Sequence, residues 1–389
     1  MERTEGDGKR ILIANVLLTA LVVILPLALW NEYTMYEKVA PLATLITFIV
    51  LVPVFFCVTD LRAAFHDRLF LVMLAGMIIA GINIFVSGSG KGAFLTAADV
   101  LLAFYLAGRI KIPPRLLYFY YAYIGFYFYY WTYDVKGYFK GYNTNYGGLV
   151  LITGFVFAVT GLTAFYVRLK KTEKGGSRFL FIFILFMFVW GYNIIAWYRA
   201  RCALLGLVVF AVLCIVPAKI RRNKVFYALL TFAMTAGAII VSLLYVWLGQ
   251  FNDSFAIRIF YKDIISGRDA IWADLWRAFI QMPLSGIGSN YVIDVDWMNG
   301  VFEVHNGLLD ILFVHGIFVF AAVMIILVRR LWDLREKAAE DTVLWIAVSS
   351  VFSILAASFM ENFVIVPPFL VCALVLIAIP GSVCYNSSR

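Results

Sequence analysis

Charged residues are scarce in this chain, and their scarcity excludes most soluble architectures. Only 14% of the 389 residues are charged, whereas 63% are hydrophobic. A soluble domain usually carries about a quarter charged residues. Apolar runs of about 20 residues recur along the whole length, as membrane-spanning helices require. The composition therefore predicts an all-α integral membrane protein, with residues 1–389 forming one polytopic membrane domain.

Several motifs of catalysis and cofactor binding are also missing. The chain has no P-loop, no His-Glu-x-x-His and no Gly-x-Ser-x-Gly sequence, and no soluble domain with a nucleotide-sugar motif. Its five cysteines show no Cys-x-x-Cys spacing, so they indicate buried thiols and no metal site. We expect no cofactor and no metal. A reaction at the outer face would then need a substrate that is already activated.

Hydropathy divides the chain into about twelve spans. The first follows Lys9 and Arg10, and its length favours a retained helix over a signal peptide. The expected spans are 11–30, 40–59, 69–86, 94–108, 116–135, 147–168, 179–197, 203–218, 225–249, 306–328, 342–360 and 367–385.

The net charge of +9 is explained mainly by topology. With a cytoplasmic N-terminus, the inner connections hold 22 of the 32 Lys and Arg residues. This bias is the positive-inside rule, and it predicts that both termini are cytoplasmic. No nucleic-acid partner is needed to explain the charge. The fifth span holds twelve aromatic residues between Tyr118 and Tyr133, which indicates interfacial anchoring and packing more than sugar or lipid binding.

Cations in the outer connections are disfavoured by the positive-inside rule, so they are candidates for a functional role. Arg199 and Arg201 lie in the very short connection before the eighth span. The long connection 250–305, between spans nine and ten, holds four more. These cations could bind an anion, or they could snorkel or pair with nearby Asp residues. The four are Arg258, Lys262, Arg268 and Arg277.

The long connection contains one amphipathic pattern. Ser266 could cap a helix, with Asp269 completing a capping box, and Pro283 would end it. We expect this helix to lie at the membrane surface. Arg268 would then stand in its first turn beside free backbone N–H groups, a plausible phosphate or pyrophosphate site. The alternative is a surface Arg paired with an Asp.

Two further features complete this connection. Gly286 and Gly288 allow a tight turn or a close backbone approach. His305, followed by Asn306, is the only one of three histidines expected at the outer face. An imidazole there could take a proton from a hydroxyl nucleophile. A lone His at a helix start is more often a polar interfacial residue.

These residues resemble the bacterial O-antigen ligase and polymerase superfamily. The carrying pattern is Ser266-Gly-Arg268, Trp272, Pro283-x-x-Gly286-x-Gly288 and then His305-Asn306, nine residues and Gly316. Arg201 is similar to an Arg that precedes the eighth span in this family, although Ala200 and Cys202 depart from its usual neighbours. Val319 also departs from the pattern after Gly316.

The resemblance implies a glycosyltransferase of the bacterial inner membrane with a periplasmic active site. A glycan on undecaprenyl pyrophosphate would pass to a sugar hydroxyl of lipid A–core oligosaccharide, without metal and with inversion. His305 would orient or deprotonate the acceptor hydroxyl, and Arg201 and Arg268 would also be catalytic. Together with Arg199, these two arginines would bind the donor pyrophosphate. Supporting roles would fall to Asn306, Ser266, Gly286 and Gly288.

Two other functions remain open at this point. An O-antigen polymerase shares the same connection and also uses a lipid-linked glycan as acceptor. A lipid-glycan flippase or other transporter would need charges along a central path. Asp99 and Asp310 are the acidic residues expected inside spans, and broken helices in matching halves are not evident. We expect Arg201, Arg268 and His305 to converge on one cavity if the enzymatic interpretation holds.

Overall fold

The structure of the chain is a computed structural model. It describes residues 5–31, 33–133, 144–172, 176–251, 258–259, 262–263, 265, 267–298 and 302–383. These residues are almost entirely helical. The membrane-type helices are α1 (Glu5–Leu29), α2 (Tyr33–Val58), α4 (Arg68–Ser87), α5 (Lys91–Ala107), α6 (Pro114–Tyr133), α8 (Thr144–Lys171), α9 (Ser177–Tyr198), α10 (Arg201–Cys214), α12 (Lys224–Thr235), α13 (Gly237–Gly249), α15 (Gly307–Glu340), α16 (Thr342–Ala357) and α17 (Pro367–Val383).

Shorter elements fill the connections between these helices. Two are single-turn helices, and α14 is the helix of the long connection. A two-stranded antiparallel sheet precedes α14, with Arg258 opposite Asp263. These elements are α3 (Leu61–Ala64), α11 (Ala218–Arg221), β1 (Arg258–Ile259), β2 (Lys262–Asp263), α14 (Arg268–Gln281) and the 3₁₀ turn η2 (Asp296–Met298).

Each of the twelve expected spans falls on a helix, with one span made of two pieces. The ninth is divided into α12 and α13, which meet at an angle of 54°. By length and hydropathy, six described helices could cross a membrane, or seven if the bent pair counts as one span. Helices α10, α16 and α5, with 14, 16 and 17 residues, are shorter than the 18 that this criterion requires. The architecture is therefore that of an integral membrane protein, and the count of twelve stays a prediction.

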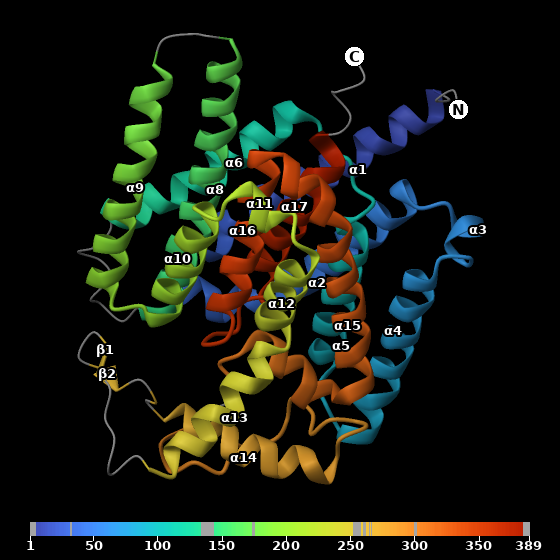
Figure 1. Cartoon of the computed structure of the whole chain (residues 1–389). Coiled ribbons are helices and arrows are strands. Elements are labelled where there is room, and N and C mark those ends of the chain that lie inside the picture. The colour runs from blue at the N-terminus through green and yellow to red at the C-terminus, as the bar shows by residue number, and fades with distance from the viewer. Residues whose placement is uncertain are drawn as a thin grey trace.

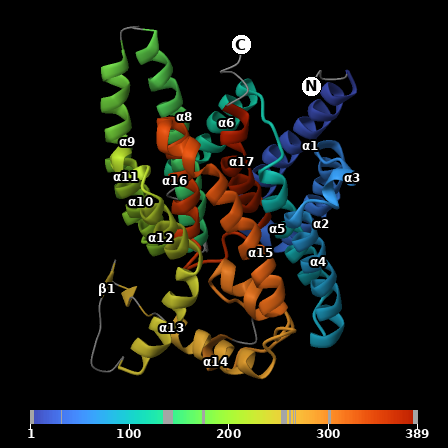
Figure 2. The same ribbon diagram turned by 45° about the vertical axis from the view of Figure 1, so that its right-hand side comes forward.

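Two C-terminal helices form the centre of the molecule. From Leu344 to Ala357 every residue of α16 is buried, and the described side chains of α17 are buried as well. α16 packs against α8, α10, α15 and α17 (Figures 1 and 2). Outer helices instead expose large apolar side chains, such as Phe179 and Ile182 on α9. Such faces suit contact with lipid.

The start of α1 and the end of α17 lie at one end of the molecule, and α13 and α14 lie at the other (Figures 1 and 2). This arrangement fits the expectation that the long connection 250–305 lies across the membrane from both termini. The periplasmic location itself stays a prediction, because no membrane is present.

The helix expected in the long connection is present, but its start and its surroundings differ from the expectation. α14 begins at Arg268, and its N-cap is Gly267, with a φ of 80° and no side-chain cap. The expected cap Ser266 lies outside the described residues. The apolar face of α14 is buried against protein, with Ile271, Trp272 and Leu275 at most 1% exposed. α14 therefore docks onto α13 and α15 instead of resting its apolar face on lipid.

A break in α15 explains Gly286 of the long connection and Gly316 of α15 itself. Gly316 has a φ of 81° and a ψ of 174°, which interrupts the helix. The segment 283–287 fills this break: Ile287 N donates to Phe313 O at 2.7 Å, and Ile317 N donates to Pro283 O at 2.9 Å. A Cβ on Gly286 would lie 2.5 Å from Val314 O. The two glycines thus allow direct contact between two backbones.

Replacing Gly316 by alanine is expected to destabilise the protein by about 2–4 kcal/mol. The new Cβ would lie 2.1 Å from Leu284 O, and the left-handed φ adds backbone strain. Gly92 near the start of α5 is a matched control, because nothing lies within 4 Å of its Cβ position. Thermal unfolding in detergent should show a lower Tm for Gly316→Ala and no loss for Gly92→Ala. Equal Tm values would contradict the packing role of Gly316.

Candidate active site

His305 lies at the entrance to α15 with an unusual backbone. Its φ is 54°, in the left-handed region that non-glycine residues rarely adopt. Several hydrogen bonds hold this conformation in place. Trp272 Nε1 of α14 donates to the carbonyl of Val304 at 2.8 Å, and Gly307 N donates to the carbonyl of Glu361 at 3.2 Å. Strain that the surrounding structure enforces is typical of functional sites.

Asn306 is a structural cap for α15. Its Oδ1 accepts from Leu308 N at 3.2 Å and from Leu309 N at 3.1 Å, and its Nδ2 donates to Phe359 O at 3.2 Å. Its backbone N–H donates to Asn362 Oδ1 at 3.0 Å. Asn306 therefore fixes the position of His305 by tying the start of α15 to the connection between α16 and α17.

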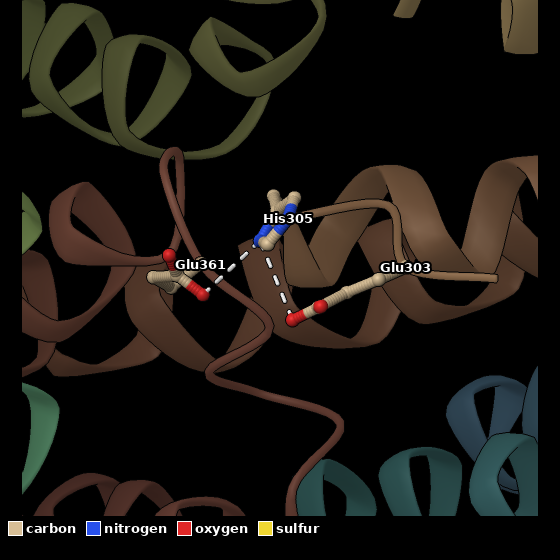
Figure 3. Close-up of side chains that lie close together, drawn as sticks. All are labelled: Glu303, His305 and Glu361. Carbon is tan, nitrogen blue, oxygen red and sulfur yellow. Dashed lines mark hydrogen bonds and ion pairs between the residues drawn. The ribbon is translucent and has the colours of Figure 1, made fainter. Parts of the chain in front are cut away.

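Glu361 in that connection is the residue that sequence reasoning missed. Its carboxylate is 5% exposed and lies between two of the expected site residues. His305 Nδ1 is 3.4 Å from Glu361 Oε2, and Arg268 donates to Glu361 Oε1 at 2.9 Å. Figure 3 shows Glu361 and Glu303 on two sides of the imidazole, each joined to His305. The sequence did contain a signal for Glu361, because it is the only acidic residue after Asp341 and lies between two apolar segments.

The cluster changes the protonation chemistry of His305. Burial alone would lower its pKa, but the hydrogen bond and charge of Glu361 and the charge of Glu303 outweigh it. The pKa of His305 is therefore raised. Burial also opposes ionisation of Glu361, yet His305 and Arg268 hold the pKa of that carboxyl below its usual value. Burial raises the pKa of Glu303. An imidazole beside a buried carboxylate is a strengthened base.

The arginine expected in the first turn of α14 is buried instead of exposed. The Arg268 side chain is 8% exposed and donates to Met360 O at 2.8 Å as well as to Glu361. By contrast, Arg277 is 74% exposed and lies 3.7 Å from Asp274, which is the pairing considered for the loop cations. Arg268 thus belongs to the same buried cluster as His305.

A small pocket joins Arg268 to Arg201. It has a volume of about 130 Å³ and also receives Asn145, which hydrogen-bonds to Glu361. Arg201 is the first residue of α10, so backbone N–H groups of that helix start lie nearby. The pocket brings two guanidinium groups together, an arrangement suited to phosphate oxygens. Its lining is Asn145, Arg201, Cys202, Leu205, Tyr245, Ile259, Arg268 and Met360.

The other expected residues lie elsewhere. Arg199 is the C-cap of α9, with an exposed side chain, and is not part of the pocket lining. Gly286 contacts the break in α15, and Gly288 packs against Ser87 and Ser89 at the end of α4. The structure thus joins Arg268 and His305 through Glu361 and places Arg201 beside Arg268 in the pocket. His305 is not part of that pocket lining, so the three residues do not share one cavity as expected. The two glycines make packing contacts with α15 and with the end of α4.

Spacing alone would let this cluster hold a metal ion. Glu303, His305 and Glu361 each offer a ligand atom, and these atoms lie within 4.8 Å of one another. Glu361 already carries the guanidinium of Arg268, however, and a cation there would have to share its charge. We therefore interpret the cluster as a proton-transfer site, and the absence of a metal requirement stays a prediction.

Comparison with known proteins finds a family that part of the chain resembles. No curated protein and no solved structure matches the chain. A family model described as O-antigen ligase matches residues 186–324, a range that contains Arg201, Arg268 and His305 but ends before Glu361. This integral membrane protein therefore carries a region, residues 186–324, that is similar to the O-antigen ligase family.

Proposed function

We propose that this protein is an O-antigen ligase. It transfers a glycan from undecaprenyl pyrophosphate to a sugar hydroxyl of lipid A–core oligosaccharide at the periplasmic face of the bacterial inner membrane. The observation that carries the proposal is the contact series from His305 through Glu361 to Arg268, which ends at a pocket shared with Arg201. These contacts support a base that is linked to an anion site.

The reaction follows from these positions. His305 takes the proton of the acceptor hydroxyl, and that oxygen attacks the anomeric carbon of the donor sugar. The bond from this carbon to the pyrophosphate oxygen breaks, and undecaprenyl pyrophosphate leaves. Attack opposite the leaving group inverts the anomeric carbon. Glu361 orients the imidazole and stabilises its protonated form, as a carboxylate beside a catalytic histidine does.

Arg201 and Arg268 bind the pyrophosphate and stabilise the charge that develops on it. Arg268 uses one terminal nitrogen for Glu361 and Met360, and a guanidinium has five N–H donors. Arg268 also lines the pocket that it shares with Arg201. The donor supplies its own driving force through the bond between the sugar and the pyrophosphate, which breaks in the reaction, so neither ATP nor a metal is needed.

Arg268→Lys is expected to lower the ligation rate by about 10²–10³-fold. Lysine keeps the charge but loses the planar fork that holds Glu361 and the pyrophosphate together. The assay measures attachment of O-antigen to core in a ligase-null strain at equal membrane abundance of each variant. Arg277→Lys is the matched control, because Arg277 is exposed on the same helix. Full activity of Arg268→Lys would argue against bidentate binding.

The same strain separates ligase from polymerase. Loss of ligase leaves bare core together with normal lipid-linked polymer. Loss of a polymerase leaves core that carries single repeat units. The second pattern in the null strain would assign this protein to polymerisation. Wild-type ligation by Arg201→Ala and Arg268→Ala together would overturn the proposed anion site.

A further inference from the structure

A second polar pocket lies far from His305. It has a volume of about 310 Å³ and is formed by the start of α1, the end of α2 and the connection after α5. α15 links the two regions: Arg330 donates to the carbonyls of Phe104 and Tyr105 near the end of α5. Arg330 lies 23 residues after Gly307, which is roughly 35 Å along a helix. The pocket is therefore at the opposite face from the candidate active site.

Three cations line this pocket, namely Arg10, Arg109 and Lys111. Arg109 pairs with Asp67. Arg10 and Lys111 have exposed side chains and form no ion pair with any residue that the structure describes. Asp60 also lines the pocket, and its Oδ1 accepts from Arg62 N at 3.0 Å. Two cations thus remain available for an anionic group.

The pocket wall also holds buried polar atoms without partners. Asn15 and Thr59 are 2% and 4% exposed, and Asn15 Oδ1 and Thr59 Oγ1 accept or donate no hydrogen bond within the described residues. The Asn15 amide is fixed, since its Nδ2 donates to Ile11 O at 2.8 Å and to Lys111 O at 3.0 Å. Its oxygen therefore has no donor among the residues that the structure describes. Unsatisfied buried polar atoms commonly mark a missing ligand or water.

Apolar side chains continue from the pocket along α1. Leu12, Ile13 and Val16 directly follow Arg10 and are 65%, 51% and 59% exposed. They lie where the first span enters the hydrocarbon layer in the expected topology. A ligand here would thus meet cations and hydrogen-bonding atoms at one end and lipid-facing helix at the other. This combination matches a phospholipid at the membrane interface.

We propose that this pocket binds the headgroup of an anionic phospholipid with a free hydroxyl, of the phosphatidylglycerol type. Its phosphate pairs with Arg10 and Lys111, and its headgroup hydroxyls bond to Asn15 Oδ1 and Thr59 Oγ1. The acyl chains run along the exposed face of α1. A soluble phosphate compound offers the same charge but no chains, so the membrane lipid is the occupant that uses the whole surface.

The test measures lipid retention by native mass spectrometry of full-length protein from nanodiscs that contain equal phosphatidylglycerol and phosphatidylcholine. Wild type is expected to retain phosphatidylglycerol. The double variant Arg10→Gln/Lys111→Gln should bind it roughly 30-fold more weakly, since each surface cation contributes roughly a fivefold factor. The matched control is Lys170→Gln/Lys171→Gln, which removes two exposed cations at the end of α8. Equal retention by both double variants would overturn the proposal.

Thr59→Val tests the proposed headgroup contact without changing the charge of the pocket. It removes one hydroxyl with little change of shape, so binding of phosphatidylglycerol should weaken about fivefold, while binding of phosphatidic acid should not change. Equal weakening of both lipids would contradict the headgroup contact. Inorganic phosphate and glycerol 3-phosphate provide the second arm. Stabilisation of delipidated protein by either one to the extent that phosphatidylglycerol gives would assign the pocket to a soluble phosphate and overturn the lipid.

Discussion

Replacing His305 by alanine is expected to reduce ligation by about 10²–10⁴-fold, the usual contribution of a positioned general base. The acceptor hydroxyl would then have to lose its proton to water, while donor binding at Arg201 and Arg268 would be retained. The rate is measured with purified lipid-linked donor and core acceptor in nanodiscs. A lower kcat with little change in donor KM would fit a loss confined to proton transfer.

Two further variants separate chemistry from folding in this experiment. His305→Asn suits the left-handed φ of 54°, which asparagine tolerates better than alanine, but it cannot act as the base. It should be as inactive as His305→Ala. His66→Ala removes an exposed histidine from the connection before α4 and should leave the rate unchanged. Activity of His305→Asn near that of wild type would rule out general-base catalysis by His305.

The rate should also depend on pH through His305. Only the neutral imidazole can accept a proton, and the two glutamates raise its pKa above the ordinary value of 6.5. The value of kcat/KM should therefore fall as the pH drops, with a midpoint above 6.5. A midpoint at or below 6.5 would contradict the arrangement of charges in the structure.

Replacing Glu361 by glutamine is expected to move this midpoint to lower pH and to slow the reaction. Glutamine removes the negative charge that raises the pKa of His305, so the imidazole stays neutral to lower pH and becomes a weaker base. A residue that served only folding would not shift the midpoint. The measurement is the pH profile of kcat/KM for Glu361→Gln beside wild type.

Glu361→Gln also carries a cost in stability, and the experiment must separate it from the chemical effect. The substitution leaves the guanidinium of Arg268 buried without its counter-charge, which costs about 3–5 kcal/mol when a buried pair is broken. Thermal unfolding therefore accompanies each pH profile. Glu340→Gln, at an exposed side chain at the end of α15, is the matched control and should change neither quantity. A lower Tm with an unshifted midpoint would make Glu361 purely structural.

The twelve apolar segments could be located from the sequence because burial in lipid requires about 20 apolar residues in a row. α14 could be located as well, since Ile271, Leu275 and Phe279 recur at helical spacing. The spacing of its apolar residues does not determine whether lipid or protein contacts the apolar face. The same apolar stripe would suit lipid or protein, and only the packing on α13 and α15 decides for protein.

The sequence and its family resemblance selected Arg201, Arg268 and His305, because few cations and only one histidine are expected at the outer face. Only the tertiary structure revealed Glu361, whose contacts to Arg268 and His305 span 93 and 56 residues of chain. It also gave Gly286 and Gly316 their shared role, because the approach of two backbones depends on how a connection folds back onto α15. Residue type limits what a side chain can do, whereas its charge and reactivity depend on neighbours that folding brings from distant segments.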